Sequence, residues 1–174
     1  KNSENFLLSK ISSAYIEVIR NTPLLIQLYL LYFGLGQLGI QLEAFWVAFI
    51  GLTLNNGAYV AEIFRAGFKV VHKGGIEAGL ALGFDKSQVF RYVVFTPALK
   101  SIFPALTNQF ILLFLFSSIT STIAYEDLTY QIMNINSQTA LTFEIFIVGT
   151  IIYYVASLIL TQVLKFAEKK AFKW

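Results

Sequence analysis

The 174-residue chain is rich in apolar residues: 56% of it is hydrophobic, 13% is charged, and the mean hydropathy is +0.65. Ordinary soluble domains carry about 25% charged residues, so this composition indicates a membrane protein. Cysteine is absent and histidine occurs once, at His72, which excludes disulfides, thiolate chemistry and a multi-histidine metal site within the chain.

The predicted elements begin with a polar N-terminal stretch, which four membrane-spanning helices follow. The first twenty or so residues hold no apolar run long enough to cross a bilayer, so we expect neither a signal peptide nor a span there. Pro23 suits the first turn of a helix, where its missing N–H costs nothing. The predicted spans cover residues 24–38, 44–64, 99–124 and 143–166. This pattern predicts an all-α helical bundle that forms a single transmembrane domain over residues 1–174.

The distribution of basic residues predicts the orientation of these spans. All thirteen Lys and Arg residues lie before residue 21, between residues 65 and 100, or after residue 164. The 37–43 turn and the 125–142 loop contain none. By the positive-inside rule, we expect the N-terminal segment, the 65–100 loop and the C-terminus in the cytoplasm. This spacing also argues against nucleic-acid binding, because that function needs the basic residues gathered in one patch.

A short, partly polar segment at residues 76–85 lies within the basic loop, between flanks that are expected in lipid. Gly74 and Gly75 are predicted to end the preceding helix. Gly83 is predicted to end the short helix itself, because glycine accepts the left-handed backbone conformation. Asp85 is predicted to cap the next helix in a capping box. On physical grounds alone, an amphipathic helix that lies on the membrane surface explains this segment equally well.

Polar side chains inside the predicted spans have two possible roles. Amides in hydrocarbon either bond neighbouring helices or line a path, and both interpretations remain open. A hydroxyl-rich run at the predicted outer end of the third span precedes a carboxylate that could attract a cationic or zwitterionic solute, but such hydroxyls can also bond their own helix. The candidate path residues are Asn55, Asn56, Asn108, Gln109, Ser117, Ser118, Ser121, Thr122 and Glu126. Glu62 is expected to pair with Arg65 or with a loop lysine.

Four motifs occur in order along the chain. They are residues 15–27, residues 57–67, the Glu77-Ala78 to Leu82-Gly83 segment with a proline after the 93–95 run, and residues 104–108. Together they resemble the permease subunits of ATP-binding-cassette (ABC) importers for polar amino acids, of the histidine, glutamine and arginine type, whose cytoplasmic EAA loop is similar to the third motif. The chain departs from this family at Gly79, in place of an alanine, at Thr96-Pro97, in place of Leu-Pro, and at Leu115, in place of a lysine.

The resemblance implies a function and a set of partners. It implies that the chain forms the translocation path for a polar amino acid in a bacterial cytoplasmic membrane. The implied partners are a cytoplasmic ATP-binding subunit dimer, a second permease subunit, identical or homologous, and an extracytoplasmic solute-binding protein. The implied ATPase-docking residues are Glu77, Ala78, Gly79, Leu82, Gly83, Phe84 and Asp85. The partner would bind ATP and Mg, since this chain has no P-loop, and no cofactor or enzymatic site is expected within it.

Two further expectations follow from the same comparison. Family members normally carry one more helix before this point, so we expect the family's first helix to be missing. An alternative from another class also remains open, namely an ATP-independent channel, carrier or assembly subunit whose amphipathic loop lies at the membrane interface. Glu77 discriminates between the two, because only a docking helix needs its carboxylate.

Overall fold

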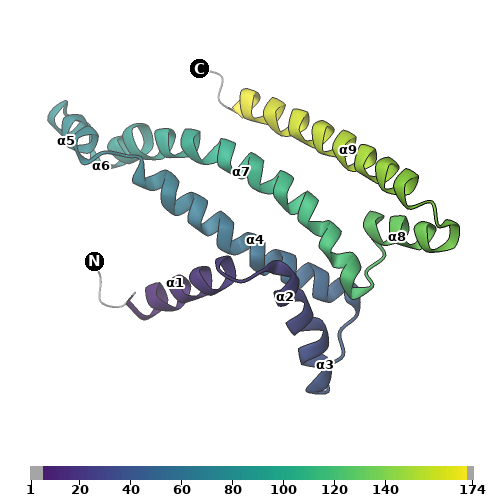
Figure 1. Cartoon of the computed structure of the whole chain (residues 1–174). Coiled ribbons are helices and arrows are strands. Elements are labelled where there is room, and N and C mark those ends of the chain that lie inside the picture. The colour runs from purple at the N-terminus through teal and green to yellow at the C-terminus, as the bar shows by residue number, and fades with distance from the viewer. Residues whose placement is uncertain (1–5, 172–174) are drawn as a thin grey trace.

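The computed structural model describes residues 6–171, and its regular elements over that range are all helical (Figure 1). Three segments are long and apolar enough to cross a membrane: Ala44–Lys69, Lys86–Ile123 and Thr142–Lys170. Two further helical segments meet this criterion only when they are taken together, namely Phe6–Arg20 and Leu24–Gln37. The angle of the bend between them is 106°. The predicted all-α membrane fold is confirmed, with three long spans and a fourth only if the bent pair crosses as one unit.

The N-terminal part of the described chain is a bent corner. It consists of α1 (Phe6–Arg20), α2 (Leu24–Tyr29), η2 (Leu30–Gly34) and α3 (Leu35–Gln37). Pro23 separates α1 from α2 with an extended backbone, φ −63° and ψ 137°. Residues 24–37 rise only ~21 Å at ~1.5 Å per residue, which is short of a ~30 Å hydrocarbon core. The prediction that residues 24–38 span the membrane alone is therefore corrected, because a span here also needs α1.

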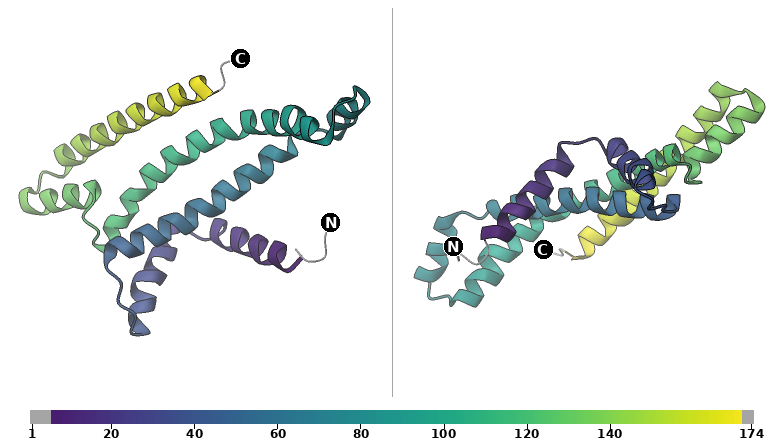
Figure 2. Two further views of the ribbon diagram at one scale, coloured as in Figure 1. Left: turned by 180° about the vertical axis from the view of Figure 1, so that it is seen from behind. Right: turned by 90° about the horizontal axis from the view of Figure 1, so that it is seen from below.

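The central pair of helices is α4 (Ala44–Lys69) and α7 (Thr96–Phe116), which pack against each other (Figures 1 and 2). Glycine permits their close approach, since a Cβ at Gly67 would overlap the Ile102 side chain. The buried core lies where α2, α4 and the end of the third span meet. It consists of Leu24, Leu28, Val47, Ala48 and Ile123.

The third span is one helical segment of 38 residues, Lys86–Ile123. It comprises α6 (Lys86–Gln88), the π-helix η3 (Val89–Phe95), α7 and the 3-10 helix η4 (Ser117–Ile123). It begins well before the predicted residue 99, because the polar cap at Asp85 starts the helix outside the apolar run. The helix that starts at the Asp85 cap therefore continues without a break through α7 to Ile123.

The C-terminal hairpin of α8 (Leu128–Thr139) and α9 (Thr142–Ala171) packs against the third span. Asp127 starts α8, because its Oδ1 accepts a hydrogen bond of 2.7 Å from the Tyr130 N–H. Gly149 lets α9 approach α8, since a Cβ there would overlap Ile132. The 125–142 segment, predicted as a loop, is thus largely helical.

Candidate functional site

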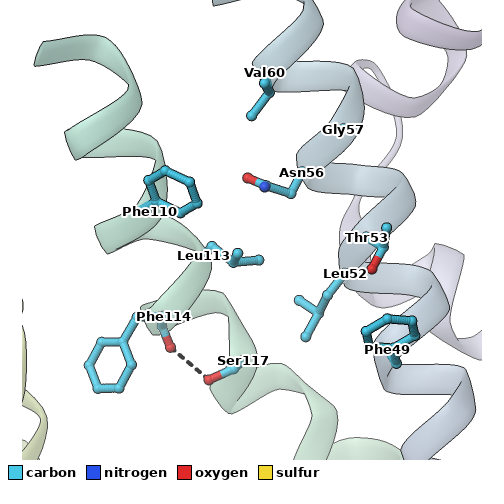
Figure 3. Close-up of a pocket in the computed structure, with 10 residues that line it drawn as sticks. All are labelled: Phe49, Leu52, Thr53, Asn56, Gly57, Val60, Phe110, Leu113, Phe114 and Ser117. Carbon is cyan, nitrogen blue, oxygen red and sulfur yellow. Dashed lines mark hydrogen bonds between the residues drawn. The ribbon is translucent and has the colours of Figure 1, made fainter. Parts of the chain in front are cut away.

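A groove of about 650 Å³ lies between α4 and α7 (Figure 3). Residues of α4 form one wall, and residues of α7 with the first residue of η4 form the other. The lining residues are Phe49, Leu52, Thr53, Asn56, Gly57, Val60, Phe110, Leu113, Phe114 and Ser117. The walls are mainly apolar, with Thr53, Asn56 and Ser117 as their polar side chains. A concave apolar surface with a few polar groups is typical of a small-molecule site.

Asn56 is the amide that extends from α4 toward α7 in this groove (Figure 3). Its Oδ1 accepts a hydrogen bond of 3.0 Å from Nε2 of Gln109, a buried residue of α7. Within residues 6–171, the Asn56 Nδ2 donates to no protein group. Asn56 therefore bonds the facing helix and keeps a donor available at the groove.

Asn55 points to another part of the protein, although it is the next residue in the chain. Its Nδ2 donates a hydrogen bond of 3.1 Å to Gln27 Oε1 in α2. Gln27 Nε2 in turn donates to the carbonyl oxygen of Ile19 at 2.8 Å, across the break between α1 and α2. Asn55 thus fixes the bent corner onto α4, which is a packing role, and it does not line the groove.

The hydroxyl-rich run is η4, and its hydroxyls bond their own helix. Each donates to the carbonyl oxygen three residues earlier, as Ser117 does to Phe114 at 2.7 Å (Figure 3). Ser117 lines the groove, whereas Ser118, Ser121 and Thr122 do not. Exposed Asn108 and Glu126 also lie outside its lining. Of the nine predicted path residues, the structure places Asn56 and Ser117 in the groove and Gln109 against Asn56.

Apolar side chains make most of this groove, and none of them was among the residues predicted from the sequence. Leu52, Val60, Phe110 and Leu113 each resemble lipid-facing residues of a span when the sequence is considered alone. A usable signal was present, because the lining positions recur every three or four residues and Asn56 lies on the same face. Such a stripe with one amide in it marks the face of a helix that meets a partner helix or a solute.

The motif that resembles the EAA loop folds into α5 (Lys73–Ala81), at the tip of the hairpin that α4 and α7 form (Figure 1). Gly74 and Gly75 lie inside its first turn, so the prediction that they end the preceding helix is wrong; α4 ends at Lys69. Gly83 ends the motif as predicted, with φ at +86°. The predicted capping box is also confirmed: the Gln88 N–H donates to Asp85 Oδ1 at 2.8 Å, and the Asp85 N–H donates to Gln88 Oε1 at 3.0 Å.

The residues of this loop divide into a packed side and an exposed side. Gly79 is buried, and a Cβ there would lie 3.3 Å from methyl groups of both Val89 and Val93 in η3. A small residue is therefore required where the family pattern has alanine. Leu82 is 78% exposed, a large value for an apolar side chain. The other exposed residues of the predicted docking set are Glu77, Ala78, Gly83, Phe84 and Asp85.

An ion-pair cluster ties α1 to the end of α4 that leads into this loop. Glu62 accepts hydrogen bonds from Arg65, one of them from Nε at 2.7 Å, which confirms the predicted pair. Arg20 of α1 lies 3.6 Å from the same carboxylate and stacks over the Tyr59 ring at 5.4 Å. Arg20 was not predicted as a partner of Glu62, because this contact depends on the bend at Pro23.

The sequence of this chain is similar to those of known transport proteins. Residues 2–173 match the family described as binding-protein-dependent transport system inner membrane component. An arginine transport system permease protein of Bacillus subtilis is 40% identical over 161 residues, which cover 92% of this chain and 74% of that protein. The glutamine transport system permease protein of Escherichia coli K12 is 32% identical over 167 residues, or 95% of this chain and 76% of that protein.

A structural comparison agrees with these matches. The crystal structure of an amino acid ABC transporter with histidines has a TM-score of 0.80 to this chain at 44% identity, and the match covers 91% of this chain and 74% of that one. The alternative of an unrelated ATP-independent channel or carrier is not favoured by these relatives. The chain belongs to the inner membrane components of binding-protein-dependent transport systems, the permease subunits of ABC importers.

Proposed function

We propose that this permease subunit forms the translocation path for a polar amino acid and that α5 couples it to a cytoplasmic ATPase. The observation that supports this best is the two-sided character of the loop. Gly79 packs against η3, while Glu77 and Leu82 face outward. A short helix with an exposed charge beside an exposed apolar side chain is suited to a groove on a partner protein.

A continuous helical route leads from α5 to the groove. α5 contacts η3, and η3 runs without a break into α7, which carries Phe110 and Leu113 of the groove wall. From Gln88 to Phe110 this route is about 33 Å long at ~1.5 Å per residue. Nucleotide-driven closure of two ATPase subunits would displace α5 and, through this route, one wall of the groove relative to α4. Such relative motion alternates access to the site from the two sides of the membrane.

The groove has the chemistry to hold an amino acid. The Asn56 Nδ2 can donate a hydrogen bond to an α-carboxylate, and the apolar walls can contact the aliphatic part of a side chain. Relatives named for arginine and for glutamine transport support a polar amino acid as the cargo. Ser117, and Glu126 nearer the proposed outer surface, remain predicted contributors to the route.

The proposed assembly contains several further components. Three or four spans are too few to enclose a solute, so a second permease subunit, identical or homologous, would complete the walls. The family supports an ATPase dimer, which would hold ATP and Mg, and an extracytoplasmic solute-binding protein. α5 and the C-terminal end of α9 lie toward the same end of the molecule (Figure 1). From the positive-inside rule we expect both in the bacterial cytoplasm.

Reconstitution of the chain with its ATPase and binding protein tests the docking role. Glu77→Ala removes the exposed charge, and Gly83→Val places a β-branched residue at a φ of +86°. Both variants should insert into the membrane but hydrolyse ATP without uptake. His72→Ala is the matched control, because His72 is exposed in the same loop and its side chain makes no cap hydrogen bond. Unchanged coupling and ATPase binding in both variants would contradict the docking role.

A further inference from the structure

Three lysines and one glutamate gather where the third and last spans meet. Lys100 of α7 and Lys165, Glu168 and Lys169 of α9 line a cavity of about 330 Å³. The packing of α7 against α9 brings these distant parts of the sequence together. The cavity shares no lining residue with the groove between α4 and α7, so the two are separate sites.

The cavity carries an excess of positive charge that the protein leaves without a partner. Three ammonium groups face one carboxylate, and within residues 6–171 none of the three forms an ion pair. Lys169 lies in the last turn of α9, where the helix C-terminus favours a cation. This effect does not explain Lys165, which precedes the last turn, or Lys100, which lies inside the continuous Lys86–Ile123 helix and far from either end.

Apolar surface adjoins this charge on α9. Val163 is 59% exposed and Phe166 is 71% exposed, and only 6% of the apolar window of this span is buried inside the protein. A ligand at the cavity would therefore meet ammonium groups at one end and apolar helix surface at the other. Basic pockets between spans at the membrane surface suit anionic lipid headgroups. The apolar helix surface beside the lysines can contact the acyl chains of a lipid, whereas a soluble protein would not cover it.

We propose that Lys100, Lys165 and Lys169 bind the phosphate of an anionic phospholipid, whose acyl chains lie along α7 and α9. The Glu168 carboxylate can accept a hydrogen bond from a headgroup hydroxyl, such as those of phosphatidylglycerol. The lipid would then bridge two helices at the membrane surface through charge and apolar contact together. The proposal depends on insertion into a bilayer, and it depends neither on α5 docking nor on the identity of the solute.

Lipid retention by the assembled complex tests this site. The complex is reconstituted in nanodiscs of phosphatidylcholine that contain phosphatidylglycerol, and the retained phospholipid is counted by native mass spectrometry. The test variant is Lys100→Gln/Lys165→Gln. The matched control is Lys10→Gln/Lys170→Gln, which removes the same charge from positions outside the cavity. Phosphatidylcholine carries the same phosphate beside a compensating cation, and all proteins should retain it equally weakly.

We expect the affinity for phosphatidylglycerol to fall about fivefold for each cavity lysine removed and to stay unchanged in the control. Equal retention in the two double variants would overturn the proposal. Displacement of the lipid by inorganic phosphate alone would instead indicate a site for a free anion. Loss of the ATPase from the test variant with unchanged lipid would identify the cavity as a protein interface.

Discussion

Gln109 of α7 donates a hydrogen bond of 3.0 Å to Asn56 of α4, across the groove that the two helices form. The acceptor is Oδ1 of the Asn56 amide. Nδ2 of the same amide donates to no protein acceptor in the described part of the chain. Asn55, one residue earlier, bonds Gln27 of α2 instead. Two adjacent amides thus have different environments, and the difference can be tested.

Asn56→Ala should weaken the apparent affinity for the transported amino acid by about 0.5–1.5 kcal/mol, because it removes one net hydrogen bond to the solute. Asn55→Ala is the matched control, since it deletes the same amide one residue away. We expect it to lower the thermal stability of the purified protein, because Gln27 loses its partner, and to leave the affinity unchanged. Uptake kinetics in reconstituted vesicles measure the apparent affinity, and thermal unfolding in detergent measures the stability. An affinity loss in Asn55→Ala alone would contradict the assignment of Asn56 to the solute route.

Gly67→Ala should destabilise the protein by about 1–3 kcal/mol, because the added methyl overlaps the Ile102 side chain between α4 and α7. Ile102→Ala in the same chain removes the overlapping atoms but also a buried side chain, so the double variant should lose less stability than the sum of the two single losses. Gly36→Ala is the control, since no atom lies within 4 Å of a Cβ at that position. Thermal unfolding midpoints compare the variants, and a loss in the double variant equal to the sum of the two single losses would argue against this close approach.

Membrane-impermeant thiol labelling tests the orientation, and the chain has no native cysteine to interfere. Lys73→Cys in α5 and Gln88→Cys in α6 should react only from the cytoplasmic side. Gln41→Cys in the turn before α4 and Gln138→Cys in α8 should react only from outside. All four positions are exposed on this chain, so burial inside the subunit does not prevent labelling. Reversed labelling would exclude a cytoplasmic ATPase as the partner of α5.

Glu126→Gln should reduce uptake of cationic amino acids more than uptake of neutral ones, since it removes an exposed carboxylate near the proposed outer surface and preserves its shape. Ser117→Ala should alter apparent affinity more than Ser118→Ala, because Ser117 alone of the two lines the groove. A panel of amino acids in competition uptake assays measures these effects. If selectivity and affinity stay the same in all three variants, these residues do not contribute to the solute route.

The local features of the docking loop could be predicted from the sequence. Gly83 adopts the left-handed conformation and Asp85 forms its capping box with Gln88, and each feature depends on only a few neighbouring residues. α1 and α8 could not be predicted in the same way. Both are too polar to be recognised as apolar spans in the sequence. In the structure α1 packs against α4, and α8 packs against α9.

The groove could not be predicted from the sequence, because it is formed by contacts between residues far apart in the chain. Asn56 and Gln109 are separated by 53 positions, so their contact reflects the register of α4 against α7. The same is true of Arg20 and Glu62, which meet only because the chain bends by 106° after α1. Polar residues in spans could therefore be identified as candidates, but their division between packing and path could not.

The central claim is that this chain couples ATP hydrolysis by a partner to the uptake of a polar amino acid. Its most direct test is uptake of labelled arginine and glutamine into sealed vesicles that contain the purified complex, with ATP inside and binding protein outside. We predict that at least one of these amino acids accumulates against its gradient, only with ATP present and only with Glu77 and Gly83 intact. Equal flux of both with and without ATP would contradict the claim and indicate a passive channel.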